Sequence, residues 1–292
     1  MSFWNDKTVL IFGAGYSGKA FAKLATAARA KVYGTTRSPE KYNAKADGFE
    51  PVLFDGKSHE QLSALISEAD VIVQSIAPNE HGDPVLKAFA SQLYNAKPTR
   101  MAYLSTVGVY GNHDGNWVDE TASPNPVSER SKQRVAAENA WRELADACNA
   151  PLSLLRLSGI YGPGRNAFCN LEKGTARRLV KPNQVFNRIH VSDIARSLMF
   201  LGERQADGTF NVTDDLPAPP QDVVEHAALL MEVDVPEAID FETATLSPMA
   251  RSFYGENKRV SNAKLKEMGF TFDYPDYKTA FDRMWAENTW RS

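Results

Sequence analysis

Residues 8–18 read Thr-Val-Leu-Ile-Phe-Gly-Ala-Gly-Tyr-Ser-Gly, in which strand-forming residues run directly into a G-x-G-x-x-G motif. The following residues, 19–30, have the pattern of a helix. In this context Gly13 allows a tight turn, Gly15 lets a pyrophosphate approach the backbone, and Gly18 lets the helix pack on the strand. The free N–H groups and the positive end of the helix dipole would then face the phosphates. The segment therefore predicts a dinucleotide-binding site.

The composition argues against several other classes of protein. The 292 residues are 43% hydrophobic and 24% charged, with a net charge of −3, so we expect no nucleic-acid or anionic-membrane partner. Cys148 and Cys169 lack metal-ligand spacing, and we expect reduced thiols and no metal site. No apolar run approaches the ~20 residues of a membrane span, and we see no signal peptide, which favours a cytoplasmic protein.

Strands and helices alternate through the first part of the chain. This alternation predicts an α/β fold with a Rossmann-type, doubly wound parallel sheet over residues 1–160. After Gly159 the pattern becomes short and irregular, which predicts a smaller substrate-binding region over 161–292 that partly returns to the sheet. We expect strands at 8–12, 31–36, 51–54, 70–76, 100–105 and 152–157, and helices that include 60–69, 84–95 and 127–147.

The end of the second predicted strand bears on the choice of cofactor. An acidic residue at this position normally binds the adenosine ribose hydroxyls and repels a 2′-phosphate. Here the chain has no acid but Thr36, Arg37 and Ser38, whose guanidinium and hydroxyls suit a phosphate. This pattern predicts NADP(H) rather than NAD(H); the alternative is that Arg37 is simply solvated. The other residues expected at the cofactor are Tyr16, Ser17, Asp55, Ser75 and Ala77.

Several later segments carry a family resemblance. They are Ser105-Thr106-Val107-Gly108-Val109-Tyr110-Gly111, Arg156 with Tyr161-Gly162-Pro163, residues 188–195 (RIHVSDIA) and residues 257–260 (NKRV). Together with the glycine motif, and in this order, they make the chain resemble the extended short-chain dehydrogenase/reductase family, which includes sugar-nucleotide epimerases and dehydratases. The resemblance covers essentially the whole chain.

The resemblance implies a hydride-transfer mechanism. A Ser or Thr hydroxyl would bind the substrate oxygen, and by position this is Thr106, with Ser105 beside it. In the family a Tyr then acts as acid or base, and a Lys one helical turn later lowers its pKa. A phenol with an ordinary pKa near 10 needs such a cation to work near neutral pH.

The helix that should carry the Tyr and Lys departs from the family pattern. One register places Ser128 and Lys132 there, and a second register places Arg130 and Arg134. We favour the second because the spacing from Arg134 to Glu138 matches the family. Neither register supplies a Tyr, and a hydroxyl or guanidinium is a poor general base. The chain is thus predicted to be an atypical member in which Arg130, Lys132 and Arg134 bind the nicotinamide ribose or a substrate carboxylate or phosphate, unless they are only a solvated helix face.

Two tyrosines could replace the missing phenol. Tyr161 follows the sixth predicted strand, and Tyr110 lies four residues after Thr106. The alternatives are a structural role for either tyrosine and a bound water as the proton donor. We expect His190 to be structural, and His113 to be a loop histidine that could reach a substrate.

The second region offers groups for an anionic substrate. Arg165, Arg251 and Tyr254 are the residues expected to bind it, although a charged surface loop is the alternative. The predicted function is an NADP(H)-binding oxidoreductase that acts on a small carbonyl or hydroxyl substrate. The alternatives are a sugar-nucleotide epimerase or dehydratase, and a non-catalytic NADP(H) sensor or scaffold. The resemblance also suggests a homodimer formed through the helix at 127–147.

Overall fold

A seven-stranded sheet forms the centre of the computed structural model, which describes residues 2–291. Its order is β3-β2-β1-β4-β5-β7-β11, and the pairs β1/β2, β2/β3, β1/β4 and β4/β5 are parallel. Sequence order therefore reverses between β1 and β4, as in a doubly wound fold, and the prediction of this fold is confirmed. The strands are β1 (Thr8–Phe12), β2 (Lys31–Thr36), β3 (Glu50–Leu53), β4 (Val71–Gln74), β5 (Arg100–Thr106), β7 (Leu152–Leu157) and β11 (Gly208–Val212).

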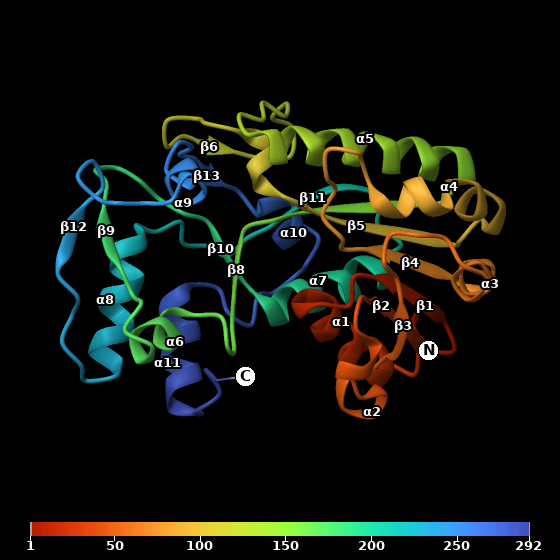
Figure 1. The fold of residues 1–292 in the computed structure, drawn as a ribbon, viewed down its shortest axis with the longest axis horizontal. Helices are drawn as coiled ribbons and strands as arrows, with labels where there is room; N and C mark the ends of the chain where they lie inside the picture. The colour runs from red at the N-terminus through yellow and green to blue at the C-terminus, as the bar shows by residue number, and fades with distance from the viewer. Residues whose placement is uncertain (1, 292) are drawn as a thin grey trace. The chain divides into compact units, whose positions relative to one another are not determined.

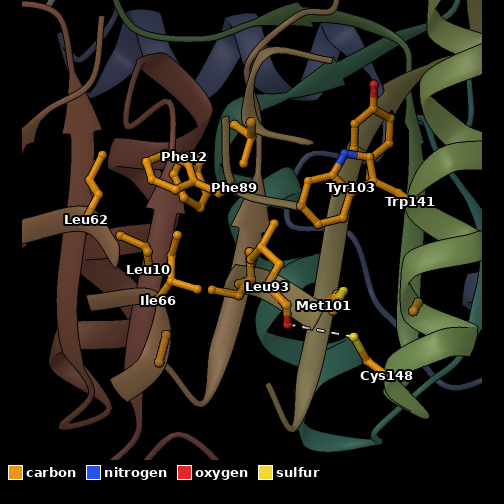
Figure 2. Close-up of a cluster of buried hydrophobic side chains, with 14 of the residues drawn as sticks. Leu10, Phe12, Leu62, Ile66, Phe89, Leu93, Met101, Tyr103, Trp141 and Cys148 are labelled. Atoms are coloured by element: carbon orange, nitrogen blue, oxygen red, sulfur yellow. Dashed lines mark hydrogen bonds between the residues drawn. The ribbon is translucent and has the colours of Figure 1, made fainter. Parts of the chain in front are cut away.

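Helices cover both faces of this sheet (Figure 1). The helices α3, α4 and α5 bury their apolar stripes against one face, where Phe12, Phe89, Tyr103 and Trp141 belong to one core cluster (Figure 2). The helices α1 and α7 lie on the other face. The helical segments are α1 (Tyr16–Ala27), α2 (Ala44–Asp47), α3 (Glu60–Glu68), α4 (Pro84–Ala96), α5 (Glu129–Cys148), α7 (Val191–Glu203) and the 3₁₀ turns η1 (Pro39–Lys41) and η2 (Val107–Tyr110).

Local chemistry explains where these helices begin. Asp83 caps α4 by accepting hydrogen bonds from the N–H groups of Val85 and Leu86, and Pro84 occupies the first helical position. Helix α1 begins at Tyr16, three residues earlier than predicted, because the glycine turn leads straight into it. Helix α5 begins at Glu129 rather than at residue 127.

The chain divides into two compact units that are built from alternating segments. Unit 1 comprises Met1–Val109, Glu129–Arg156 and Ile194–Phe210, and unit 2 comprises Tyr110–Ser128, Leu157–Asp193 and Asn211–Ser292. Apart from the last residues of β7 and β11, the central sheet lies in unit 1.

Unit 2 contains short paired strands and an aromatic cluster. The pairs β8/β10, β9/β12 and β6/β13 are all parallel. The aromatic cluster, by which we mean Tyr161, Phe168, Phe281 and Trp290, packs α6 and α11 together. The elements are β6 (Trp117–Val118), β8 (Gly159–Tyr161), β9 (Arg178–Val180), β10 (Arg188–His190), β12 (Ala238–Asp240), β13 (Arg259–Val260), α6 (Ala167–Glu172), α8 (Pro220–Leu230), α9 (Pro248–Phe253), α10 (Ala263–Glu267) and α11 (Tyr277–Ala286).

Two kinds of feature are absent from the residues that the structure describes. No helix there is long and apolar enough to cross a bilayer. Within the same residues, no group of His, Cys, Asp and Glu side chains has the arrangement of a metal site.

Candidate functional site

The glycine loop of unit 1 has the geometry that a pyrophosphate needs. Gly13 has a φ of +86°, and a Cβ there would lie 2.8 Å from the side chain of Ile76. A Cβ on Gly18 would lie 2.8 Å from the carbonyl oxygen of Gly13, so this glycine is required for close packing of helix on loop. A Cβ on Gly15 would meet no atom within 4 Å. The space over Gly15 is therefore open to a ligand, and the loop fits a bound dinucleotide.

The start of α1 strengthens this fit. Its N-cap is Gly15, which provides no capping side chain, and its first turn contains no acidic residue. The amide groups of this turn and the positive end of the helix dipole are thus suited to an anion. Tyr16 is half-buried here, and Ser17 is buried.

The predicted 2′-phosphate residues lie directly after β2. Thr36 ends the strand and accepts a hydrogen bond from the N–H of Ser38 at 3.2 Å. Arg37 is exposed, and among residues 2–291 no carboxylate forms an ion pair with it. An exposed guanidinium without a carboxylate partner can bind a phosphate without first breaking a salt bridge.

The remaining cofactor candidates follow β3 and β4. Asp55 is exposed, and its carboxylate accepts a hydrogen bond from the N–H of Lys57. Ser75 is half-buried, and its N–H donates to the carbonyl of Phe12 at 2.8 Å; Ala77 is exposed. The structure thus gathers the predicted cofactor residues at the carboxyl ends of β1, β2, β3 and β4, where ligands bind in this kind of sheet.

The two hydroxyls at the end of β5 have different environments. Ser105 is buried and donates to Oε1 of Glu138 at 2.5 Å, while Oε2 of Glu138 pairs with buried Arg156 at 2.9 Å. Thr106 is half-buried, and its Oγ1 accepts a hydrogen bond from the N–H of Gly108 at 3.1 Å. The Ser105 proton is therefore committed to Glu138. The Thr106 hydroxyl has its oxygen held in place and can donate its proton to a substrate oxygen.

The cations of α5 also differ from one another. Arg134 donates to the phenol oxygen of Tyr103 at 3.2 Å and to the carbonyl of Leu104 at 3.0 Å. Burial raises the pKa of Tyr103 despite this nearby charge, so that phenol stays protonated and is no substitute for the missing base. Lys132 is exposed and forms an ion pair with Glu129 at 2.7 Å. Arg134 therefore braces the end of β5, whereas Lys132 faces solvent.

The two candidate phenols lie in unit 2, and both are buried. Tyr110 donates to Oδ1 of Asn211 at 2.7 Å. Tyr161 is 7% exposed, and its ring lies 5.4 Å from that of His190. Burial, followed by the charge of Asp214, raises the pKa of Tyr161, and burial lowers the pKa of His190 to about 4. These roles stay predictions, and burial makes the phenol of Tyr161 a weak proton donor.

Two of the three predicted substrate residues gather around one ring in unit 2. The guanidinium of Arg251 lies 4.8 Å from the ring centre of Phe241 and donates to the carbonyl of Ala244 at 2.9 Å. Tyr254 stacks on the same Phe241 ring, with 4.7 Å between ring centres. Arg165 is exposed in a turn after β8. The substrate roles of these three residues stay predictions.

Three buried polar residues of unit 1 were not predicted from the sequence. Thr35 is buried in β2 and accepts a hydrogen bond from the N–H of Gly13 at 2.9 Å. Gln74 and Asp83 are buried and bonded to each other beside the glycine loop. Gln74 gave a signal, since it is a polar residue within an apolar, β-branched run.

The family model for the NAD dependent epimerase/dehydratase family matches residues 9–213. The chain belongs to this family. Its resemblance to the extended short-chain dehydrogenase/reductases is thereby confirmed. A nicotinamide dinucleotide is the cofactor of the family, in agreement with the open space over Gly15.

Solved structures of similar fold extend this result. A functionally unknown conserved protein from Silicibacter pomeroyi is 41% identical, with a TM-score of 0.88 over 97% of this chain and 99% of that one. Human epimerase family protein SDR39U1, solved with NADPH, is 19% identical, with a TM-score of 0.75 over 96% and 99%. The dTDP-glucose 4,6-dehydratase of Bacillus anthracis, solved with NAD, is 17% identical, with a TM-score of 0.74 over 98% of both chains. Among curated proteins, none matches this epimerase/dehydratase-family chain.

Proposed function

We propose that this protein is an NADP(H)-dependent oxidoreductase of the epimerase/dehydratase family that acts on a small carbonyl or hydroxyl substrate. The observation that carries the cofactor choice is the exposed Arg37, which has no carboxylate paired with it among residues 2–291 and follows β2 beside the glycine loop. An acid at this place would favour the free ribose of NAD(H). The guanidinium instead suits a 2′-phosphate.

The cofactor would be held by the residues at the strand ends of unit 1. The loop from Gly13 to Gly18 would bind the pyrophosphate, and Arg37, with Thr36 and Ser38, would bind the 2′-phosphate. When bound, the cofactor supplies or accepts a hydride. The protein contributes orientation and charge around it.

Thr106 is the residue that would hold the reacting oxygen of the substrate. Its Oγ1 is fixed by the N–H of Gly108, so its proton is directed to another acceptor. A hydrogen bond to a carbonyl oxygen stabilises the negative charge that develops there on reduction. Ser105 would not bind the substrate itself, because its proton is donated to Glu138; this bond instead fixes the end of β5 beside Thr106.

A bound water is the proton donor that the arrangement favours. Burial raises the pKa of Tyr161 and so makes its phenol a weak proton donor, and the phenol of Tyr110 already donates to Asn211. In unit 1, Arg134 is bonded to the end of β5. An anionic substrate would use the exposed cations Lys132, Arg165 or Arg251.

The cofactor assignment is tested by substituting Arg37. In Arg37→Ala the Kd for NADPH should rise about 100-fold or more, because the 2′-phosphate loses its charged partner, while the Kd for NADH should change by less than about threefold. Both constants can be measured by calorimetric titration. Lys87→Ala, which removes an exposed cation from α4, is the matched control and should change neither. Equal losses for both nucleotides in Arg37→Ala would refute the preference for NADP(H).

A second candidate is a non-catalytic NADP(H) sensor, which is favoured by the absence of a Tyr from the start of α5. Mixing the protein with NADPH and a panel of carbonyl compounds, and following the absorbance of the reduced nicotinamide, separates the two functions. Turnover that Thr106→Val abolishes supports the enzyme. Nucleotide binding without turnover of any compound supports the sensor. Turnover of nucleotide sugars without net change in the nicotinamide would indicate the epimerase activity found elsewhere in the family.

A further inference from the structure

Gln74 makes an unusual set of hydrogen bonds at the end of β4. Its side chain is fully buried. Its amide nitrogen donates to both carboxylate oxygens of Asp83, at 3.0 and 2.8 Å. Its amide oxygen accepts from the N–H of Ile76 at 2.9 Å. One side chain therefore fixes the first turn after the strand and ties it to the start of α4.

The segment that Gln74 fixes lies against the glycine loop. A Cβ on Gly13 would lie 2.8 Å from the side chain of Ile76 and 3.2 Å from its backbone nitrogen. The N–H of Ser75 donates to the carbonyl of Phe12, the residue just before Gly13, at 2.8 Å. Ser75 and Ile76 thus form one wall of the loop. Any movement of this wall would change the space in which a pyrophosphate would bind.

Asp83, the hydrogen-bond partner of Gln74, is itself bonded to two helices. Its carboxylate accepts from the N–H groups of Val85 and Leu86 at the start of α4. It also accepts from the indole nitrogen of Trp141 in α5 at 3.0 Å. Figure 2 shows Trp141 in the core beside Tyr103, with which it stacks. A buried carboxyl group that accepts this many hydrogen bonds has a fixed position, because its donors hold it from several directions.

We propose that Gln74 and Asp83 are positioning residues for the dinucleotide site. They set the backbone of Ser75 and Ile76 against the glycine loop, so that the space over Gly15 keeps the shape that binds the cofactor. This inference rests on the proposed function, since it requires that NADPH binds at the loop. It adds the residues that shape the site without touching the ligand.

The matched pair Gln74→Met and Trp141→Phe separates positioning from general stability. Gln74→Met keeps the size of the side chain but loses the bonds to Asp83 and Ile76. Trp141→Phe removes one bond to Asp83 from the opposite side and leaves the link to Ile76 intact. Both should lower the melting temperature. Fluorescence titration of the full chain with NADPH should show a Kd raised about tenfold for Gln74→Met and changed less than about twofold for Trp141→Phe.

A reversed pair provides the rescue. In a Trp141→Phe background, Gln74→Glu alone places two carboxylates together and should weaken NADPH binding. Adding Asp83→Asn restores the bond with its polarity reversed, because the new amide donates to the new carboxylate while its oxygen still caps α4. The double substitution should return the Kd to within about threefold of that background.

The outcomes distinguish this inference from the function on which it rests. If the unaltered protein binds no NADPH, the proposed function fails and the positioning role fails with it. If it binds NADPH, but Gln74→Met and Trp141→Phe shift the Kd equally, the proposed function stands and the positioning role is overturned. A missing rescue in the reversed pair also overturns it.

Discussion

The carboxyl edge of the central sheet and the aromatic cluster of unit 2 place their polar side chains in opposite environments. At the sheet edge, Arg37 is exposed and Thr106 is half-buried with a proton to donate. In the aromatic cluster, Tyr161 is packed against Phe281, and its hydroxyl has no hydrogen-bond partner among the described residues. Both places follow the ends of strands. The difference shows that a position at the end of a strand does not by itself make a polar residue able to bind a ligand or exchange a proton. The residue must also be accessible to solvent.

The largest effect is expected at the buried polar network of the sheet edge. Glu138→Leu removes the carboxylate that pairs with buried Arg156 and that accepts a hydrogen bond from Ser105. The free energy of unfolding should fall by about 3–5 kcal/mol, because removing one member of a buried ion pair is strongly destabilising. Urea unfolding measures this loss. Glu143→Leu, at an exposed position of the same helix, is the control and should stay within about 0.5 kcal/mol.

The next effect is a pH dependence of stability that arises in unit 2. Burial lowers the pKa of His190 to about 4, from an ordinary 6.5, so the unfolded chain binds this proton more readily than the folded protein. The stability from this residue is therefore complete above pH 6.5, and it is lost as the pH falls toward 4, by about 3 kcal/mol in all. Unfolding of the unaltered protein and of His190→Gln, compared at several pH values, isolates this contribution. A constant difference between the two proteins would contradict it.

A smaller effect, on NADPH binding alone, is expected for a substitution in the glycine loop. Gly15→Val places a side chain in open space, where its Cβ would meet no atom within 4 Å, so the fold should be kept. The Kd for NADPH should rise about 100-fold, because the side chain fills the space for the pyrophosphate. Gly18→Val is the contrasting variant, since its Cβ meets the oxygen of Gly13 at 2.8 Å and should also reduce stability. Unchanged binding in Gly15→Val would exclude this loop as the cofactor site.

The smallest effect is expected at the exposed start of α5. Lys132→Ala breaks an exposed ion pair with Glu129 and should change the free energy of unfolding by less than about 0.5 kcal/mol. Arg134→Ala loses its bonds to Tyr103 and Leu104 and should be less stable by about 1–2 kcal/mol. Thermal or urea unfolding compares the two variants. Equal losses would show that Arg134 does not brace the end of β5.

The sequence was sufficient where one physical pattern dominates. The apolar strands and the glycine turn predicted the doubly wound sheet, and Pro84 marked the start of α4 as the structure has it. Most of the short strands of unit 2 were not found, because two or three residues, as in β6 and β8, are too few to show an alternation.

Other features depend on contacts between distant residues. Nothing local indicates that Thr35 bonds to Gly13, or that Gln74 meets the cap of α4, since each bond forms only when the strands assemble. The hydrogen bond between Ser105 and Glu138 could not be predicted either, because the two residues are far apart in the sequence. The cofactor, catalytic and substrate residues stay predictions, although the structure brings the cofactor set to one edge of the sheet.

The alternating segments of the two units have a practical meaning for anyone who shortens the chain. A fragment that stopped after residue 160 would lose α7 from one face of the sheet and β11 from its margin. Without β11 the backbone of β7 would become an unpaired edge strand that can pair with other copies of the fragment. Such a fragment should precipitate rather than fold, so studies of the nucleotide site need the uncut polypeptide.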